Sequence, residues 1–141
     1  MQNILIGREY PAVLIEKVKT AEKSIKILIY SWIWYPNEQG YTIQKFNNEI
    51  LRAARRGVNV SAFVNGDYIC NILRAEKISV KRLTTKNTMH VKMVIIDDKF
   101  LFIGSHNLTK SAFDLNHEIS VLLEDSASIL RCNNFLNALT V

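Results

Sequence analysis

Four polar residues in the second half of the chain have the types and spacing to act on a phosphate group. His90 and Lys92 begin one apolar stretch, and Ser105 and Asn107 end the next. An imidazole can act as a nucleophile or an acid-base group near neutral pH, a lysine supplies positive charge, and serine and asparagine supply neutral hydrogen-bond donors. This set suits an anionic substrate, and cleavage of a phosphodiester through a phosphohistidine is the chemistry it favours.

The two apolar stretches predict a β-hairpin with strands at Val91–Asp97 and Phe100–Ile103. We expect Asp98 and Lys99 to form a two-residue turn between them. In such a hairpin, residues whose numbers add up to 197 face each other across the two strands.

This register sets Lys92 opposite Ser105 and His90 opposite Asn107. Cross-strand partners share a face of the sheet, and side chains alternate along a strand. All four polar side chains should therefore converge on one side. Asp97 has the opposite parity and lies beside the turn, so we expect it to point away from the cluster and to have an architectural role.

The sequence offers no metal site near this cluster. No group of carboxylates is spaced to hold a pair of magnesium ions, and no histidines and cysteines have a spacing suited to zinc. We therefore expect a reaction that needs no metal and no other cofactor.

The pattern His90-x-Lys92-x4-Asp97-x6-Gly104-Ser105-x-Asn107 resembles the HKD signature of the phospholipase D superfamily, with all six fixed residue types at the usual spacing. The stretches AEKSIKILIY (21–30), ILRAARRGVNVSAFV (50–64) and NHEISV (116–121) are also similar to core blocks of that family. The resemblance covers nearly the whole chain, and it is strongest to the small nuclease branch that carries a single motif.

The resemblance implies a role for each motif residue. His90 would form the covalent intermediate, and Glu118 would orient this histidine. Lys92, Ser105 and Asn107 would hold the phosphate. Asp97 and Gly104 complete the motif as structural residues.

The rest of the chain alternates between helical and strand patterns. We expect helices at 10–23, 42–56, 67–75 and 126–139, a helical turn at 108–113, and further strands at 24–34, 58–64, 78–82 and 118–124. This order predicts an α/β fold with a mixed sheet and helices on both faces, a phospholipase D-like half-domain. Residues 1–141 should form a single catalytic domain.

Composition favours an acidic partner. The net charge is +5, and residues 1–92 carry fifteen Lys and Arg against seven Asp and Glu, whereas residues 93–141 carry three against six. This basic excess around a phosphate site indicates polyanion binding, with DNA or RNA as the expected partner. The N-terminus lacks the order of a secretory signal and no run is long enough to cross a membrane, so we expect a cytoplasmic protein without stable membrane association.

Four residues outside the motif are candidates for substrate binding. Lys81, Arg82 and Lys86 are the basic residues nearest the site in sequence and are expected to contact the substrate backbone. Trp34, in the aromatic end of the 24–34 strand, has two interpretations. It can pack in the core, which general burial tendencies favour, or it can form a stacking platform for bases.

The proposed chemistry needs two histidines, one to attack phosphorus and one to protonate the leaving oxygen. The chain has one motif, and neither other histidine can replace a second His90. His106 should turn away from the cluster between Ser105 and Asn107, and His117 has no lysine at the required offset. A homodimer that builds one site from two half-sites is therefore expected, as the family resemblance also implies.

Three functions fit these features. The first is a metal-independent nuclease that acts on DNA or RNA, which the basic half of the chain favours. The second is a phospholipase or phosphatidyltransferase, which an amphipathic membrane-surface helix or an apolar lip would favour, and the sequence shows neither convincingly. The third is a catalytically silent nucleic-acid-binding domain, against which the complete motif argues.

Overall fold

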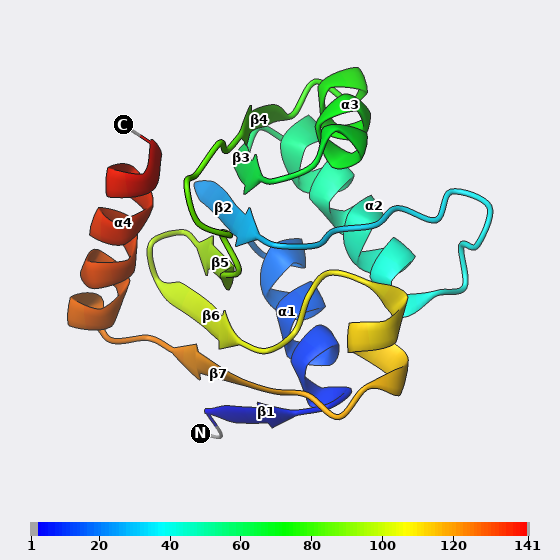
Figure 1. The fold of residues 1–141 in the computed structure, drawn as a ribbon. Coiled ribbons are helices and arrows are strands. Elements are labelled where there is room, and N and C mark those ends of the chain that lie inside the picture. Colours follow the sequence, from blue (N-terminus) through cyan, green and yellow to red (C-terminus); the bar gives the residue numbers. More distant parts are fainter. Residues whose placement is uncertain (1–2, 141) are drawn as a thin grey trace.

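The computed structural model describes residues 3–140, and within them a seven-stranded sheet is covered by helices on both faces (Figure 1). The elements are β1 (Ile4–Ile6), α1 (Glu9–Lys19), β2 (Ser24–Ile29), α2 (Thr42–Arg55), β3 (Asn59–Val64), α3 (Asp67–Ala75), β4 (Ser79–Arg82), β5 (Lys92–Ile96), β6 (Phe100–Gly104), a π-helical turn (Ser111–Leu115), β7 (Ile119–Leu123) and α4 (Ser126–Thr140). The strand order is β1-β7-β6-β5-β2-β3-β4. β2, β3 and β4 run parallel, and the other neighbours run antiparallel. The predicted α/β class with a mixed sheet is confirmed.

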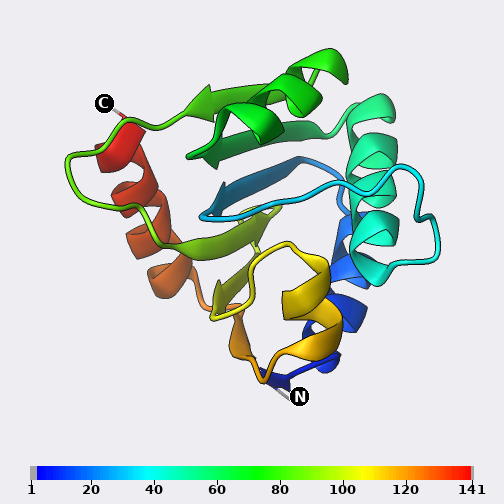
Figure 2. The same cartoon turned by 45° about the vertical axis from the view of Figure 1, so that its right-hand side comes forward.

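Two hydrophobic cores lie on opposite faces of the sheet. α1, α2 and α3 cover one face and α4 covers the other (Figure 2). Side chains alternate along β5, so Val94 and Ile96 enter the first core whereas Met93 and Ile95 enter the second. Because β5 is covered on both sides, its sequence is continuously apolar from Met93 to Ile96.

The hairpin register differs from the expected one by a single residue. Met93 pairs with Ile103 and Ile96 with Phe100, so Asp97 belongs to the loop together with Asp98 and Lys99. Asp97 and Asp98 have φ values of 57° and 49°, and the N–H of Lys99 donates to the carbonyl of Ile96 at 3.0 Å. Aspartate tolerates this left-handed backbone better than most residues. The expectation of a two-residue turn is therefore wrong.

Other boundaries differ where the chain leaves its element early. β2 ends at Ile29 instead of continuing to Trp34, and α1 ends at Lys19. The helical turn expected at 108–113 lies at Ser111–Leu115 and is π-helical. β1 was not expected, because three residues are too few to show a period, and it pairs antiparallel with β7.

None of the helices within residues 3–140 combines the length and apolar character that a membrane crossing requires.

Candidate active site

The strand ends that carry the predicted motif lie side by side along one border of the sheet, which is formed by strand ends and is here called the strand edge. β5 begins at Lys92, β6 ends at Gly104 and β7 begins at Ile119, and because neighbouring strands run antiparallel these three ends lie together. β2 is antiparallel to β5, so its last residue, Ile29, lies at the same edge. Except for Asp97, the motif residues lie at these strand ends or within a few residues of them, which brings distant parts of the sequence into one neighbourhood.

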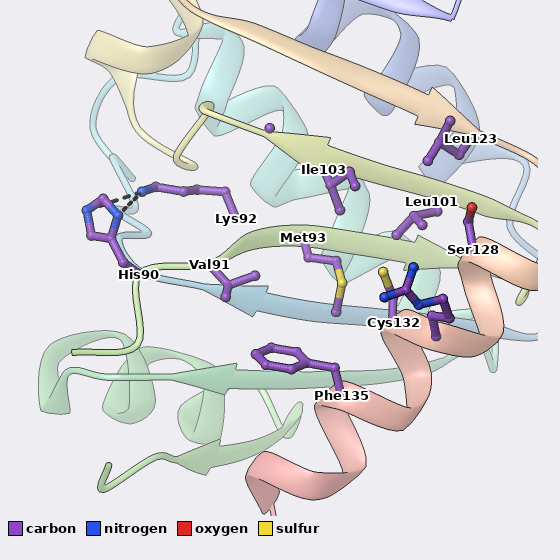
Figure 3. A pocket seen from close by; sticks show the side chains of 12 residues that line it. His90, Val91, Lys92, Met93, Leu101, Ile103, Leu123, Ser128, Cys132 and Phe135 are labelled. Carbon is purple, nitrogen blue, oxygen red and sulfur yellow. Dashed lines mark hydrogen bonds between the residues drawn. The ribbon is translucent and has the colours of Figure 1, made fainter. Parts of the chain in front are cut away.

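His90 and Lys92 are in direct contact at this edge. The Nζ atom of Lys92 lies 2.7 Å from Nδ1 and 3.2 Å from Nε2 of the exposed His90 ring (Figure 3). An ammonium group can only donate, so the ring nitrogen that accepts this bond carries a lone pair. Burial lowers the pKa of Lys92, and the negative charge of Glu118 acts in the opposite direction. The arrangement places a nucleophilic imidazole nitrogen beside a positive charge.

Ser105, which follows β6, is held by hydrogen bonds to Ile119 of β7 and does not lie opposite Lys92. Its hydroxyl donates to the carbonyl of Ile119 at 3.2 Å and accepts from the N–H of Ile119 at 3.0 Å. The expected pairing of Lys92 with Ser105 is wrong, because the observed register brings Gly104 beside Lys92. Ser105 still lies at the same edge, since Gly104 lines one pocket together with His90 and Lys92.

Asn107 reaches across to the end of β2. Its Oδ1 accepts a hydrogen bond from the N–H of Ser31 at 3.2 Å. The preceding residue, Tyr30, donates its N–H to the carbonyl of Val91, next to His90. The same one-residue shift of the register means that His90 and Asn107 do not face each other, so the expected cross-strand pair is wrong. Within residues 3–140 the Nδ2 group of Asn107 makes no hydrogen bond, so its two N–H groups are available to a substrate oxygen.

Gly104 lets β6 and β7 approach closely just before the loop that holds Ser105 and Asn107. A Cβ at this position would lie 2.2 Å from the Oγ and 2.4 Å from the Cα of Ser120, so a larger residue does not fit. This close approach explains why the motif needs glycine here.

His106 is a buried anchor behind the motif. Its Nδ1 lies 2.7 Å from Oγ of Ser120, its Nε2 donates to the carbonyl of Gly7 at 2.9 Å, and its ring stacks on Tyr10 with the centroids 4.2 Å apart. Burial lowers the pKa of His106, and the hydrogen bond to Gly7 offsets only part of this effect. Both ring nitrogens are engaged, so His106 faces away from the exposed cluster.

Glu118 lies near Lys92 without bonding to His90. Its Oε2 accepts a hydrogen bond from Nδ2 of Asn116 at 3.0 Å, and its charge offsets part of the lowering of the Lys92 pKa that burial causes. Within residues 3–140 no hydrogen bond joins Glu118 to His90. Its role in orienting the histidine stays a prediction.

Asp97 lies at the opposite end of β5 from His90. Its carboxylate accepts hydrogen bonds from the backbone N–H groups of Glu22, Lys23 and Ser24, at 2.7 to 3.2 Å. Burial alone would raise the pKa of Asp97, but these hydrogen bonds and the charge of Lys23 lower it overall. Asp97 therefore joins the hairpin turn to the start of β2.

The three basic candidates are only partly brought to the site. Arg82 and Lys86 line a groove that also includes Tyr30, and Arg82 is paired with Asp67 at 2.6 Å. Lys81 is exposed and does not line this groove.

The aromatic residue at the site is Tyr30, not Trp34. Trp34 is 6% exposed and packs in the first core with Trp32, so the stacking interpretation of Trp34 is wrong. Tyr30 follows β2 directly, is 42% exposed, and its ring centroid lies 4.5 Å from that of His90. The sequence held a signal for it, because even-numbered residues of β2 face away from the first core, as Leu28 does.

A pocket of about 660 Å³ extends from His90 and Lys92 along the face of the sheet that α4 covers (Figure 3). Its walls are mostly apolar and come from β5, β6, β7 and α4, with Arg131 and Ser128 on the helix side. Elsewhere in residues 3–140, as here, no three His, Cys, Asp or Glu side chains gather closely enough to hold a metal ion.

The sequence of this chain matches a known protein family. A family model described as "Cardiolipin synthase, PLD-like domain" matches residues 14–140. The chain therefore belongs to this family of the phospholipase D superfamily, which confirms the expected superfamily.

Three relatives show how far the similarity extends. A "Phospholipase D" from Rickettsia prowazekii (strain Madrid E) is 28% identical over 118 residues, which are 79% of this chain and 53% of that relative, so the chain spans about half its length. The solved structure of NucT from Helicobacter pylori has a TM-score of 0.78 and 24% identity, covering 97% of this chain and 93% of that one. The phospholipase D family member Nuc from Salmonella typhimurium has a TM-score of 0.79 and 17% identity, covering 96% and 92%.

Proposed function

We propose that this chain is a metal-independent phosphodiesterase that cleaves nucleic acid, with residues 1–141 acting as one catalytic domain. The observation that carries the proposal is the contact between Lys92 and His90, at 2.7 Å, at the strand edge where the rest of the motif gathers. A neutral imidazole beside an ammonium group suits attack on a phosphate, because the positive charge attracts the anion and the ring keeps a lone pair.

The proposed reaction has two steps. A nitrogen of His90 attacks phosphorus, and the bond from phosphorus to the leaving oxygen breaks while a second histidine gives that oxygen a proton. The second histidine then takes a proton from water, and the resulting hydroxide displaces His90 from phosphorus. Lys92 and the Nδ2 of Asn107 would stabilise the charge on the phosphate oxygens. The hydroxyl of Ser105 would join them by turning its proton from the carbonyl of Ile119 to a phosphate oxygen.

We propose that the second histidine is His90 of a second copy of this chain. His106 is buried and both of its ring nitrogens are engaged, so it is unsuited to proton transfer at the exposed site. His117 is exposed and lies outside the motif. A two-fold dimer would bring two His90 side chains to one phosphate, with Glu118 as the partner that orients a histidine once the site is complete.

The basic surface supports nucleic acid as the substrate. The chain has a net charge of +5, and Arg82 and Lys86 line a groove that reaches Tyr30 beside His90. Cationic side chains along a groove are the usual way to track a phosphate backbone.

A lipid phosphodiester is a second candidate, favoured by the apolar pocket next to His90. Met93, Leu101, Ile103 and Phe135 line this pocket of about 660 Å³, and an acyl chain or a glyceride could occupy such a space. A lipid substrate would place its phosphate at the same His90.

The test is cleavage of labelled single-stranded DNA, duplex DNA, RNA and phospholipid vesicles in excess EDTA, by wild type beside His90→Ala. We expect wild type to cut nucleic acid and His90→Ala to fall below detection, because no nucleophile remains. Bis(4-nitrophenyl) phosphate serves as a phosphodiester without nucleotide or lipid. Full activity in His90→Ala, or dependence on a metal, would contradict the mechanism, and release of a lipid headgroup alone would move the substrate to the second candidate.

A further inference from the structure

A second groove begins at Tyr30, whose ring lies beside His90, and follows the neighbouring part of the sheet. It has a volume of about 400 Å³ and is lined by Tyr30, Asn65, Arg82, Leu83, Thr84, Thr85, Lys86, Asn87, Thr88 and Met89. Tyr30 follows β2, Asn65 follows β3 and Arg82 ends β4. These three strands are parallel, so the groove lies along their carboxyl ends, the edge at which open α/β sheets most often bind ligands.

Tyr30, one of the residues that line this groove, lies next to the proposed nucleophile. The ring of Tyr30 is 42% exposed and lies 4.5 Å from the His90 ring, at an angle of 51°. Nζ of Lys92 is 5.5 Å from the centroid of the same ring. A partly exposed aromatic side chain therefore lies directly beside the site where the phosphate would bind.

The outer part of the groove is polar and basic. Lys86 is exposed and makes no ion pair within residues 3–140, and no carboxylate lines the groove, although Asp67 pairs with Arg82 from outside it. The loop that carries Lys86 is held in place, because Nδ2 of Asn65 donates to the carbonyl of Met89 at 2.9 Å. A phosphate beyond the first base would meet this positive charge.

We infer that this groove binds the nucleotide next to the cleaved phosphate in a single-stranded nucleic acid, with its base stacked on Tyr30 and the following phosphate at Lys86. This inference rests on the proposed nuclease function. The base must be unpaired, because in a duplex both faces of each base are covered by its neighbours and no ring can stack on it. DNA and RNA share the two recognised groups, the base and the phosphate, so single strands of both kinds are tested.

The experiment compares Tyr30→Ala and Tyr30→Trp on short single strands of DNA and RNA with one cleavable phosphodiester. Each strand is made intact and with an abasic nucleotide next to that bond, on either side. Tyr68→Ala is the matched control, because Tyr68 is also an exposed tyrosine, 55% exposed, but lies on α3 outside the groove.

We expect Tyr30→Ala to lower kcat/KM on the intact strand roughly tenfold, the scale of one lost base–aromatic stack. On the strand that lacks the stacking base the same substitution should change kcat/KM by less than twofold, and Tyr30→Trp should retain activity on both. An equal loss on intact and abasic strands would overturn the inference, because it would mean that Tyr30 acts only by positioning His90.

Binding separates this inference from the catalytic proposal. We would measure fluorescence anisotropy of labelled single-stranded and duplex oligonucleotides with His90→Ala, and with Tyr30→Ala and Lys86→Ala added to it. Tighter binding of single strands that weakens in both double variants would support the groove even if no nuclease activity is found. Equal affinity for duplex and single strand, or no effect of either substitution, would overturn it.

Discussion

The imidazole of His106 is held neutral by burial, so the stability of the fold should depend on pH near the ordinary range of histidine. Its pKa is lowered in the folded protein. Below about pH 6.5 the unfolded chain binds a proton that the folded chain rejects. The free energy of unfolding should therefore fall as the pH drops from about 7 towards 5, with a slope of at most about 1.4 kcal/mol per pH unit for this residue.

Urea unfolding at a series of pH values tests this prediction on wild type and His106→Gln. The variant should be less stable at pH 7, because it loses the contacts to Ser120 and Gly7 and the stack on Tyr10. Its stability should also change less between pH 7 and 5. Parallel curves for the two proteins would show that another group sets the pH dependence.

At the scale of elements, Asp97 joins the β5–β6 hairpin to the start of β2. Asp97→Ala should lower the free energy of unfolding by about 1 to 3 kcal/mol, because the N–H groups of Glu22, Lys23 and Ser24 lose their acceptor. Asp97→Asn is the matched variant. It tolerates the positive φ of 57° and keeps one oxygen, so its loss should be smaller.

The pH dependence of this contact has a definite sign. The pKa of Asp97 is lowered in the fold, so its contribution is present above about pH 4 and is lost as the pH falls through the folded value. Urea unfolding at pH 7 and at pH 3 measures both effects. If the wild type and Asp97→Asn differed equally at both values, the charge of Asp97 would not be the cause.

The hairpin also shows where sequence reasoning stops. Its two apolar strands, its turn region and the polar residues at its open end follow from composition and alternation. The register cannot be read from the sequence in this way, because Asp97 adopts a positive φ and joins the loop. The loop is therefore one residue longer, and every cross-strand pair shifts by one residue. Ser105 and Asn107 still reach the edge, but through hydrogen bonds to Ile119 and Ser31 that lie far away in sequence.

The aromatic residues illustrate the same limit. The stretch after β2 contains two tryptophans, and both are buried in the first core, where Trp32 bonds to Asn47 and packs on Phe46 of α2. Tyr30 is exposed because β2 ends one residue before it. Which ring emerges thus depends on where a strand ends, and strand ends are the feature that periodicity defines least well.

At the scale of the whole molecule, a site shared between two copies predicts a non-linear loss of activity when active and inactive chains are mixed. Wild type and His90→Ala would be unfolded together, refolded at a fixed total concentration, and checked for a dimer by light scattering. If each site needs two His90 side chains, activity should fall with the square of the wild-type fraction. A linear fall, or a monomer with full activity, would show that one chain contains a complete site.

The contacts of His106 and β1 also set the order in which the site can form. Nε2 of His106 bonds to Gly7, and β1 pairs with β7 through residues such as Ile6 and Ile119. The loop that holds Ser105 and Asn107 is thus closed by contacts that span 99 positions, from Gly7 to His106, and 113 positions, from Ile6 to Ile119. Such long loops close late in folding. During synthesis the site would stay incomplete until β7 had left the ribosome. If the proposed nuclease function holds, the growing chain could therefore not act on the RNA around it.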